Sequence, residues 1–426
     1  MSYQTLCVLG LGYIGLPTAS TFATHGLKVI GVDTNPTVVE SLNNGKVHLF
    51  EPGLRTLVQA AIRSGNLVVK DKPQPADAFI IAVPTPFKKG KSANLDFVTT
   101  AAKAVTPHLE KGNLVILEST SPPRTTVDIV APILEKSGLT AGKDFHLAYS
   151  PERVLPGQIL RELIENARVI GGINEASARA GESLYSTFVR GEIILTDATT
   201  AEMVKLMENT YRDINIAAAN EFARLADRFH VDIWEAINLA NRHPRVRILN
   251  PGPGVGGHCI SVDPWFFVEA APDLTNLIHT ARMVNDAQPK YVLDFLVRKI
   301  GEVSRKKVSV LGLAYKPDVD DMRESPAIET IKLLRDAGAE VRIHEPFDLD
   351  YSIEGVETVR TLEHAFAQAD IILLLVGHSQ LKRIDPNKYA ESASACVVLD
   401  TVNGWERDTW ESAGFTYLRL GDGKNN

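Results

Sequence analysis

Residues 6–33 read LCVLGLGYIGLPTASTFATHGLKVIGVD and predict the fold of the N-terminal region. A short apolar run is followed by a glycine-rich turn, a helical pattern that ends at Gly26, and a second apolar run that ends on Asp33. This order of strand, helix and strand predicts a βαβ unit.

The turn of this unit carries a dinucleotide-binding pattern. Gly10, Gly12 and Gly15 form G-x-G-x-x-G directly between the strand and the helix, where the backbone can approach a pyrophosphate. Asp33 follows Gly15 by 18 residues, at the position expected to accept hydrogen bonds from a ribose 2′-hydroxyl. The alternative is a tight turn without a ligand. The complete unit favours a dinucleotide, and NAD over NADP because a carboxylate repels a 2′-phosphate.

Further buried-strand patterns extend the first domain. The runs AFIIAVPTP (78–86) and NLVILESTSP (113–122) are bounded by turn residues and separated by helical patterns, which predicts a parallel sheet covered on both faces. Ligands bind outside the carboxyl ends of such strands, so Thr85 and Thr120 are expected beside the cofactor. We expect this NAD-binding domain to span residues 1–196.

The remaining chain divides into a central helical domain, 197–300, and a C-terminal domain, 301–426. Residues 199–229 contain no Gly or Pro and begin with a capping-box pattern, Thr199 to Glu202, which predicts one long helix. Residues 306–346 again read strand, turn, helix, strand. The fold class is therefore α/β: two Rossmann-like, doubly wound parallel-sheet domains joined by a long central helix.

The composition is that of a soluble globular protein. The 426 residues are 44% hydrophobic and 23% charged, and the net charge of −7 offers no basic surface for nucleic acid. No apolar run approaches the length of a spanning helix and no signal peptide is apparent, so a cytoplasmic location without membrane insertion is expected. The three cysteines, Cys7, Cys259 and Cys396, are far apart and match no metal-binding spacing. Neither a disulfide nor a metal site is expected.

The long helix carries a polar stripe. Lys205, Asn209 and Arg212 fall at i, i+4 and i+7 and project from one face. A solvated surface stripe is the simpler explanation of the spacing. A helix between two domains is instead partly buried, and a bound ligand would satisfy its lysine and asparagine.

One cysteine lies in a glycine-rich loop, PGPGVGGHCISVDPW (251–265). A lone cysteine is usually a small buried hydrophobe, which is what the apolar surroundings of Cys7 and Cys396 predict. Cys259 instead follows several glycines, and Lys205 or His258 could favour its thiolate. Asp263 lies four residues on and could act with a base.

These motifs together resemble the UDP-glucose/GDP-mannose dehydrogenase family, nearly end to end. The resemblance rests on GLGYIGLP (10–17), AVPTP (82–86), ESTSPP (118–123), YSPERVLPG (149–157), AEMVKLMENTYRDINIAAANE (201–221), PGPGVGGHCISVDP (251–264) and GLAYKPDVDDMRESP (312–326). Within the family, NRHPRVRILNPGPGVGGHC (241–259) and VDPWFF (262–267) are most like members acting on UDP-N-acetyl-D-mannosamine.

The resemblance implies a four-electron oxidation of a nucleotide sugar's 6-hydroxyl to a uronic acid, with two NAD consumed, for surface polysaccharide biosynthesis. Cys259 would be the nucleophile that carries a thiohemiacetal and then a thioester. Lys205 and Asn209 would stabilise the oxyanion, and Asp263 would hold a water. Glu152 and Thr120 are candidates for assisting thioester hydrolysis. The base role stays open among these residues.

The family motifs also imply the binding residues and the assembly. The expected substrate contacts are Arg153, Val154, Lys205, Asn209, Arg212, His243, Arg245, Gly256, Tyr315 and Lys316. The expected cofactor contacts, besides the three glycines, are Tyr13, Ile14, Asp33, Thr85, Thr120, Thr126 and Arg323. Arg323 follows an acidic run and could equally form a surface ion pair, and Pro123-Arg124, close to Thr126, departs from the family pattern. Arg245 is expected to reach a neighbouring subunit in a homodimer.

Two other functions fit parts of the sequence. A one-step NAD-dependent β-hydroxyacid dehydrogenase shares the dinucleotide-binding domain and a Lys-x-x-x-Asn pair but needs no cysteine. A non-catalytic nucleotide-sugar sensor would have no use for the thiol. The sequence also leaves the sugar open, because UDP-N-acetylglucosamine or another nucleotide sugar differs only in the groups that a few side chains recognise.

Overall fold

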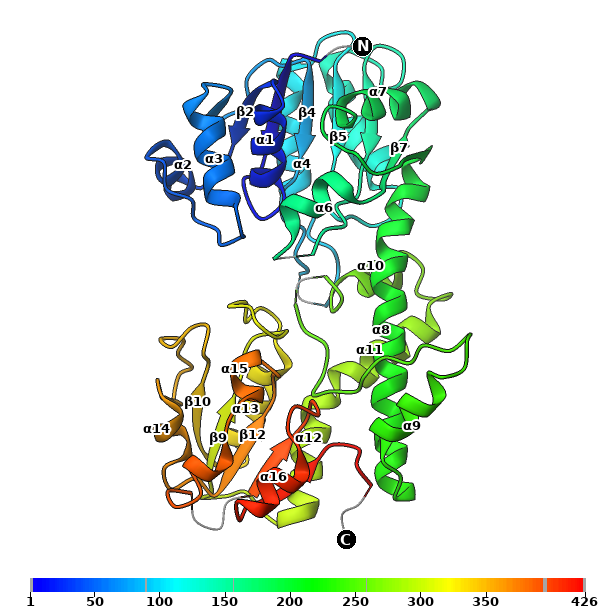
Figure 1. Ribbon diagram of the computed structural model, residues 1–426. Helices are drawn as coiled ribbons and strands as arrows, with labels where there is room; N and C mark the ends of the chain where they lie inside the picture. Colours follow the sequence, from blue (N-terminus) through cyan, green and yellow to red (C-terminus); the bar gives the residue numbers. More distant parts are fainter. Residues whose placement is uncertain (1–2, 89, 156, 258, 394–396, 424–426) are drawn as a thin grey trace. The chain divides into compact units, whose positions relative to one another are not determined.

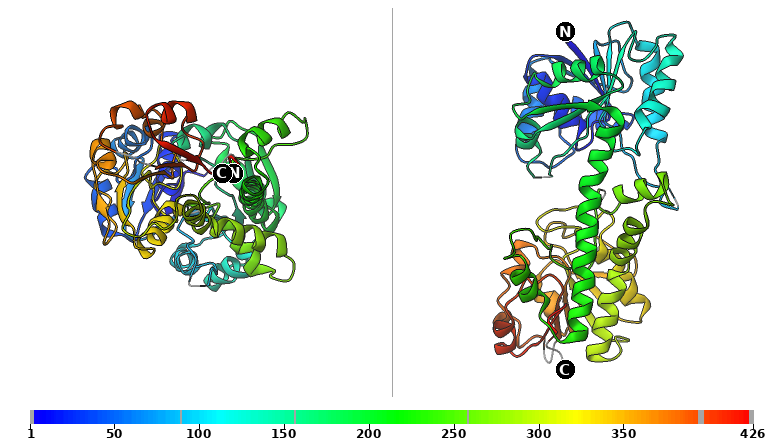
Figure 2. Two further views of the ribbon diagram at one scale, coloured as in Figure 1. Left: turned by 90° about the horizontal axis from the view of Figure 1, so that it is seen from below. Right: turned by 90° about the vertical axis from the view of Figure 1, so that its right-hand side faces the viewer.

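The computed structural model describes residues 3–88, 90–155, 157–257, 259–393 and 397–423 (Figure 1). His258 and Cys396 lie outside the described residues. The chain forms two compact units: one holds the chain up to Glu208 together with Trp265–Pro272, and the other holds Asn209–Pro264 and the chain from Asp273 onward. The boundary falls within helix α8 (Ala198–Phe229), which Figure 2 shows in green as one uninterrupted helix.

The first unit is built on an eight-stranded sheet with the order β3-β2-β1-β4-β5-β6-β7-β8. Its strands are β1 (Thr5–Leu9), β2 (Lys28–Val32), β3 (Leu67–Lys70), β4 (Ala78–Ile81), β5 (Leu114–Leu117), β6 (His146–Tyr149), β7 (Arg168–Gly172) and β8 (Ile193–Asp197). Its helices are α1 (Gly15–Thr24), α2 (Pro36–Asn43), α3 (Leu54–Arg63), α4 (Asp96–Val105), α5 (Ala131–Leu134), α6 (Ile159–Glu165) and α7 (Glu175–Tyr185).

The sheet is parallel as predicted except at one pairing. β6 and β7 are antiparallel, whereas β7 and β8 are again parallel to each other. Because β6 and β7 are antiparallel, the end of β6 and the start of β7 lie at the same end of the sheet. The connection 150–167 therefore stays at that end. This is the carboxyl end of the parallel strands, and the connection contains Glu152, Arg153 and Val154.

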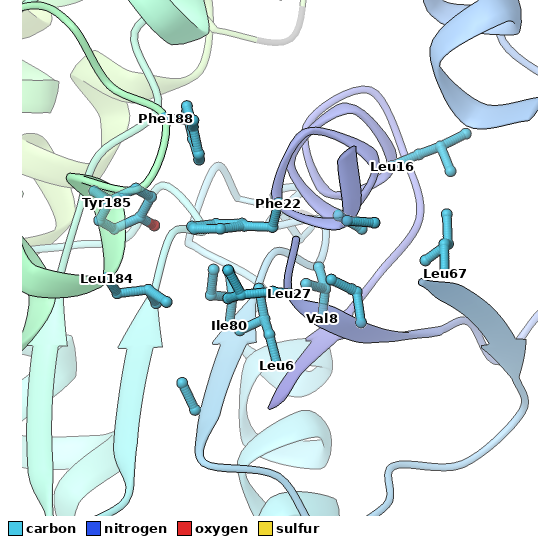
Figure 3. Close-up of a cluster of buried hydrophobic side chains, with 14 of the residues drawn as sticks. Leu6, Val8, Leu16, Phe22, Leu27, Leu67, Ile80, Leu184, Tyr185 and Phe188 are labelled. Carbon is cyan, nitrogen blue, oxygen red and sulfur yellow. The ribbon is translucent and has the colours of Figure 1, made fainter. Parts of the chain in front are cut away.

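Alternating side chains of β1 enter two cores, one on each face of the sheet. Leu6 and Val8 belong to the cluster under α1, and Cys7 and Leu9 belong to the cluster on the other face. Figure 3 shows Phe22 of α1 turned toward Tyr185 and Phe188, with ring centroids 5.7 and 4.7 Å away. Cys7 is fully buried, as predicted, and burial raises the pKa of its thiol to about 11.

The second unit holds a six-stranded, all-parallel sheet with the order β11-β10-β9-β12-β13-β14. Its strands are β9 (Lys307–Leu311), β10 (Glu340–His344), β11 (Glu357–Thr358), β12 (Ile371–Leu374), β13 (Val397–Asp400) and β14 (Thr416–Arg419). The remaining helices are α9 (Ile233–Ala240), α10 (Asp263–Ala270), α11 (Asn276–Asp286), α12 (Gln288–Ile300), α13 (Pro326–Asp336), α14 (Leu362–Phe366), α15 (Ser379–Lys382) and α16 (Arg407–Ser412). The predicted fold class is confirmed.

The two sheets share more than the sequence suggests. The order of the second sheet repeats that of β1 to β6, and VLGLGY (8–13) at the end of β1 is matched by VLGLAY (310–315) at the end of β9. Gly10 and Gly312 both have positive φ, at 92° and 84°. Both sheets therefore begin with the same strand and turn.

The long helix was predicted correctly, but its cap was not. The helix begins at Ala198, and the Asp197 carboxylate accepts the Thr200 amide at 2.9 Å. Thr199 is thus inside the first turn rather than at the cap. Glu202 turns away from the helix start and binds the segment after β5 instead. Among the described residues, none of the helices combines the length and the apolar character needed to cross a membrane.

Candidate active site

The glycines of the first turn have two different roles. An added Cβ at Gly10 would lie 2.5 Å from the Ala82 carbonyl oxygen, and one at Gly15 would lie 1.8 Å from the Gly10 carbonyl oxygen. These two glycines allow β1, α1 and β4 to approach closely. At Gly12 an added Cβ meets nothing within 4 Å. Gly12 therefore faces open space at the start of α1, which no side chain caps, and this is where a pyrophosphate fits.

Asp33 lies beside this turn. Its carboxylate accepts the Leu11 amide at 3.0 Å and the Asn35 amide at 2.8 Å, and the side chain stays half-exposed. Tyr13 and Ile14 are also half-buried in the turn. The acceptor, the open glycine and the uncapped helix start are the features that bound NAD requires, so the residues fit this cofactor.

Gly12→Val is expected to fold normally and to weaken NAD binding by about a hundredfold or more. An added Cβ at this position has no protein atom within 4 Å, and the valine side chain would occupy the space of the pyrophosphate. Fluorescence titration with NAD measures the affinity, and thermal unfolding checks the fold. Gly12→Ala should show a smaller loss. An unchanged affinity in Gly12→Val would remove the turn from the cofactor site.

The loops after β4 and β5 are tied together by a residue that the sequence did not single out. Ser119 accepts the Val83 amide at 3.0 Å and donates to the Val83 carbonyl at 2.8 Å. Thr85 and Thr120 follow these two anchored positions, and both are half-buried. Their cofactor contacts stay predictions.

Thr126 is hydrogen-bonded to Glu202, near the start of α8. It is fully buried, its hydroxyl donates to Glu202 Oε1 at 2.6 Å, and its amide donates to the same oxygen at 2.7 Å. The Arg124 amide donates to the other Glu202 oxygen at 2.6 Å. Burial raises the pKa of Glu202 to about 6. Glu202 thus binds α8 to the π-helical turn Thr125–Val130, and Thr126 contributes a structural link besides its predicted role.

The predicted residues after β6 have partners within the first unit. Arg153 forms an ion pair with Glu208 of α8, with 2.6 Å between its Nη2 and Oε1 of Glu208. Val154 packs against the core cluster under α1. Glu152 is buried, accepts the Arg153 amide at 2.6 Å, and forms an ion pair with Arg168 at 2.9 Å. Sequence reasoning missed Arg168, which lies at the start of β7.

In the second unit, the cysteine loop meets α8. Asn209 Nδ2 donates to Asp263 Oδ2 at 2.6 Å, and both side chains are buried. The Cys259 carbonyl accepts the amides of Val262 and Asp263 at 3.0 and 2.8 Å, so Cys259 lies in the turn that opens α10. Cys259 is half-buried, unlike Cys7. Three of the predicted catalytic residues, Asn209, Cys259 and Asp263, are thus linked by hydrogen bonds.

The glycines of this loop are required by packing. An added Cβ at Gly256 would lie 2.5 Å from the Glu324 carbonyl oxygen, and one at Gly257 would lie 2.7 Å from the Tyr315 ring. Gly257 also donates its amide to the Arg323 carbonyl at 3.1 Å. Gly256 and Gly257 therefore have no room for a side chain. They let the loop lie directly on the segment 315–326.

Buried amide side chains anchor the beginning of the loop, and no local sequence pattern indicated them. Asn220 Oδ1 accepts the Gly252 amide at 2.9 Å, and Gln288 Nε2 donates to the Gly252 carbonyl at 3.0 Å. Asn220 in turn donates to Asn285 at 2.9 Å. All three side chains are buried. The loop is thus fixed at Gly252, at Gly257 and at Asp263.

The other predicted substrate residues are more exposed. Of the stripe on α8, Asn209 is buried, Lys205 is half-buried and Arg212 is exposed, so the stripe is not a uniformly solvated face. His243 and Arg245 lie in the exposed turn after α9. Tyr315 and Lys316 are half-buried after β9. Arg323 is exposed and forms an ion pair with Asp321, the alternative that its sequence context suggested.

Comparison with known proteins accounts for this combination. Models of the UDP-glucose/GDP-mannose dehydrogenase family match the NAD binding domain at residues 4–189, the central domain at 199–287 and the UDP binding domain at 309–407. The chain belongs to this family. It is therefore an NAD-dependent dehydrogenase, and the glycine turn with Asp33 lies in the region matched to NAD binding.

Individual relatives match over almost the whole chain. The UDP-N-acetyl-D-mannosamine dehydrogenase of Methanocaldococcus jannaschii is 49% identical, over 99% of this chain and 97% of that protein. The NDP-N-acetyl-D-galactosaminuronic acid dehydrogenase of Ralstonia solanacearum is 46% identical, over 95% and 97%. Among solved structures, a UDP-D-ManNAc dehydrogenase from Pyrococcus horikoshii has a TM-score of 0.92 at 40% identity, covering 99% of this chain and 100% of that chain.

Proposed function

We propose that the protein oxidises the 6-hydroxyl of UDP-N-acetyl-D-mannosamine to the carboxylate, giving UDP-N-acetyl-D-mannosaminuronate and consuming two NAD per sugar. Support comes from the relatives of that name and from the match of residues 309–407 to a UDP binding domain. Such a product would serve surface polysaccharide biosynthesis in the cytoplasm, as the family resemblance implies.

Cys259 is the proposed covalent residue. NAD, when bound at the glycine turn and Asp33, would supply the hydride acceptor for each of two oxidations. Between them, the Cys259 sulfur adds to the aldehyde carbon, and the C–S bond holds the aldehyde in the site. Loss of the second hydride leaves a thioester. Water then attacks its carbonyl carbon, the C–S bond breaks, and the uronate and the Cys259 thiolate are released.

Neighbouring side chains stabilise charge and move protons. We assign the oxyanion of the sulfur adduct to the amide of Asn209 and the ammonium of Lys205. Asp263 accepts a hydrogen bond from Asn209 and so fixes the orientation of that amide. Glu152, with Thr120, is assigned to the attacking water. The observation that carries the proposal is the buried Asn209–Asp263 hydrogen bond, since the amide of the same Asp263 donates to the carbonyl of the half-buried Cys259.

The sugar is tested by NADH release with UDP-N-acetylmannosamine, UDP-N-acetylglucosamine, UDP-N-acetylgalactosamine, UDP-glucose and GDP-mannose. We expect the highest kcat/KM with UDP-N-acetylmannosamine. The Ralstonia relative makes an N-acetylgalactosamine derivative the second candidate, and preference for it or for UDP-N-acetylglucosamine would overturn the assigned sugar. A one-step β-hydroxyacid dehydrogenase would release one NADH per substrate, and a sensor would release none.

We also propose that the protein is a homodimer formed along α8. Phe222, Leu225 and Phe229 follow one face of this helix and are 42%, 44% and 66% exposed, and Val231 continues the apolar surface. These residues line a groove with Ile233 and Ile237 of α9. A second copy of the chain would cover it, and Arg245 would then complete the neighbouring site.

Phe229→Glu is expected to convert the dimer to a monomer and to raise KM for the sugar. A carboxylate in an apolar interface loses its hydration, which opposes association. Light scattering during gel filtration measures the mass. Glu221→Gln, an exposed change on the same helix, is the control. A Phe229→Glu protein that stays dimeric would place the interface elsewhere.

A further inference from the structure

Arg168 lies between two buried carboxylates in the first unit. Its Nη2 donates to Glu152 Oε2 at 2.9 Å, and its Nη1 lies 3.4 Å from Glu118 Oε1 and donates to Ser150 Oγ at 3.0 Å. The exposed fractions of the side chains are 5% for Arg168, 0% for Glu118 and 8% for Glu152. One guanidinium therefore lies between two carboxyl groups where water is excluded, and its single positive charge can balance only one of them.

The two carboxylates differ in their remaining partners. Glu152 Oε1 accepts the Arg153 amide, so both of its oxygens accept hydrogen bonds. Glu118 Oε1 accepts the Tyr185 hydroxyl, but Glu118 Oε2 has no hydrogen-bond partner among the described residues. An unpartnered buried carboxylate oxygen is costly, and a proton relieves the cost. Glu118 is therefore where a proton of this cluster resides.

We propose that Glu118 is a tuning residue for Glu152: through the guanidinium that they share, its charge sets how readily Glu152 accepts a proton from the attacking water. The inference rests on the proposed function, in which Glu152 assists thioester hydrolysis. While Glu118 is neutral, the positive charge of Arg168 acts on Glu152 alone. Once Glu118 is ionised, Arg168 is divided between the two, and Glu152 takes a proton more readily.

The ionisation falls near neutral pH. Burial raises the pKa of Glu118 to about 7, opposed by Arg168 and Tyr185 and assisted by the charge of Glu152. These groups face Glu118 from β7, from α7 and from the connection after β6. Because the carboxylate form of Glu118 is the activating one, the rate of uronate release should rise as the pH increases through 7.

Two variants of this cluster separate tuning from packing. In Glu118→Gln the rise in rate near pH 7 should disappear, and at pH 8 uronate release should be about tenfold slower than in the wild type with KM unchanged. In Tyr185→Phe, Glu118 loses the hydroxyl that stabilises its carboxylate form, so its pKa should increase. The rise in the rate of uronate release should therefore move to higher pH. Both variants disturb the same packing but change the pH profile differently. Glu175→Gln, an exposed change on the helix of Tyr185, should leave the profile unaltered.

Rapid-quench single turnovers with UDP-N-acetylmannosamine, from pH 6 to pH 9, measure uronate release after both NADH have formed. Infrared difference spectra between the substrate-free wild type and Glu118→Gln, in which the carboxyl band of Glu202 cancels, should show a carboxylic acid band that is lost between pH 6 and pH 8. A wild type without the band overturns the inference whatever the substrate. The inference is also overturned if the wild type shows the titrating band but Glu118→Gln has the same dependence of rate on pH as the wild type. If no nucleotide sugar is oxidised, the proposed function fails, and with it the tuning role, while the shared charge is still measured.

Discussion

Cys259→Ala is expected to stop uronate formation and to leave NAD binding unchanged. Without the sulfur, the aldehyde has no covalent acceptor, so the second oxidation should fall by about a thousandfold or more. NAD affinity should persist because the glycine turn and Asp33 belong to the first unit, whereas Cys259 belongs to the second. Product analysis by mass spectrometry and NAD titration measure the two effects.

Cys7→Ala is the matched control for this change. Cys7 is fully buried in β1 and distant in sequence from the loop. Its loss should lower the thermal stability and leave the product unchanged. Uronate formation at the wild-type rate by Cys259→Ala would exclude covalent catalysis by this residue.

Asn209→Ala is expected to lower kcat by about 10² to 10³-fold with a small change in KM, the loss typical of a removed oxyanion donor. It also removes the donor that Asp263 accepts at 2.6 Å in a buried position. Asn215→Ala is the control. This residue lies on the same helix, and among the described residues its side-chain amide donates to the Tyr211 carbonyl one turn earlier. Steady-state kinetics of both variants measure the difference.

The contradicting outcome for Asn209 is equally specific. If Asn209→Ala raised KM and left kcat intact, the amide would bind the ground state of the sugar rather than the oxyanion. If both asparagine variants lost activity together, the loss would come from α8 as a whole. Only a selective fall in kcat supports the proposed role.

Local patterns were sufficient to predict the main elements. The glycine turn, Asp33 and the long helix each depend on residues close in sequence, and all three are present. The direction of β7 was not predicted, because a short strand reads the same in either direction. The cap of α8 was misassigned because Asp197 and Thr199 are both good capping residues, and Glu202 has a tertiary partner at Thr126.

The structural supports of the candidate site depend on distant pairs that no local pattern contains. Glu118 lies in an apolar run and Arg168 at the start of another, and only the sheet brings them within 3.4 Å. The available signal was one charged residue directly after a buried strand, Glu118, and another at the start of a second buried strand, Arg168. The anchors of Gly252 likewise come from α8 and α12. The packing of the loop glycines could not be predicted, because the segment 315–326 that contacts them is far along the chain.

The most direct measurement of the four-electron oxidation is the amount of NADH released from a limiting, known amount of UDP-N-acetylmannosamine at completion. The account predicts two NADH per sugar, with the uronate as the only product and no free aldehyde. One NADH per sugar, with the aldehyde or another two-electron product accumulating, would contradict it.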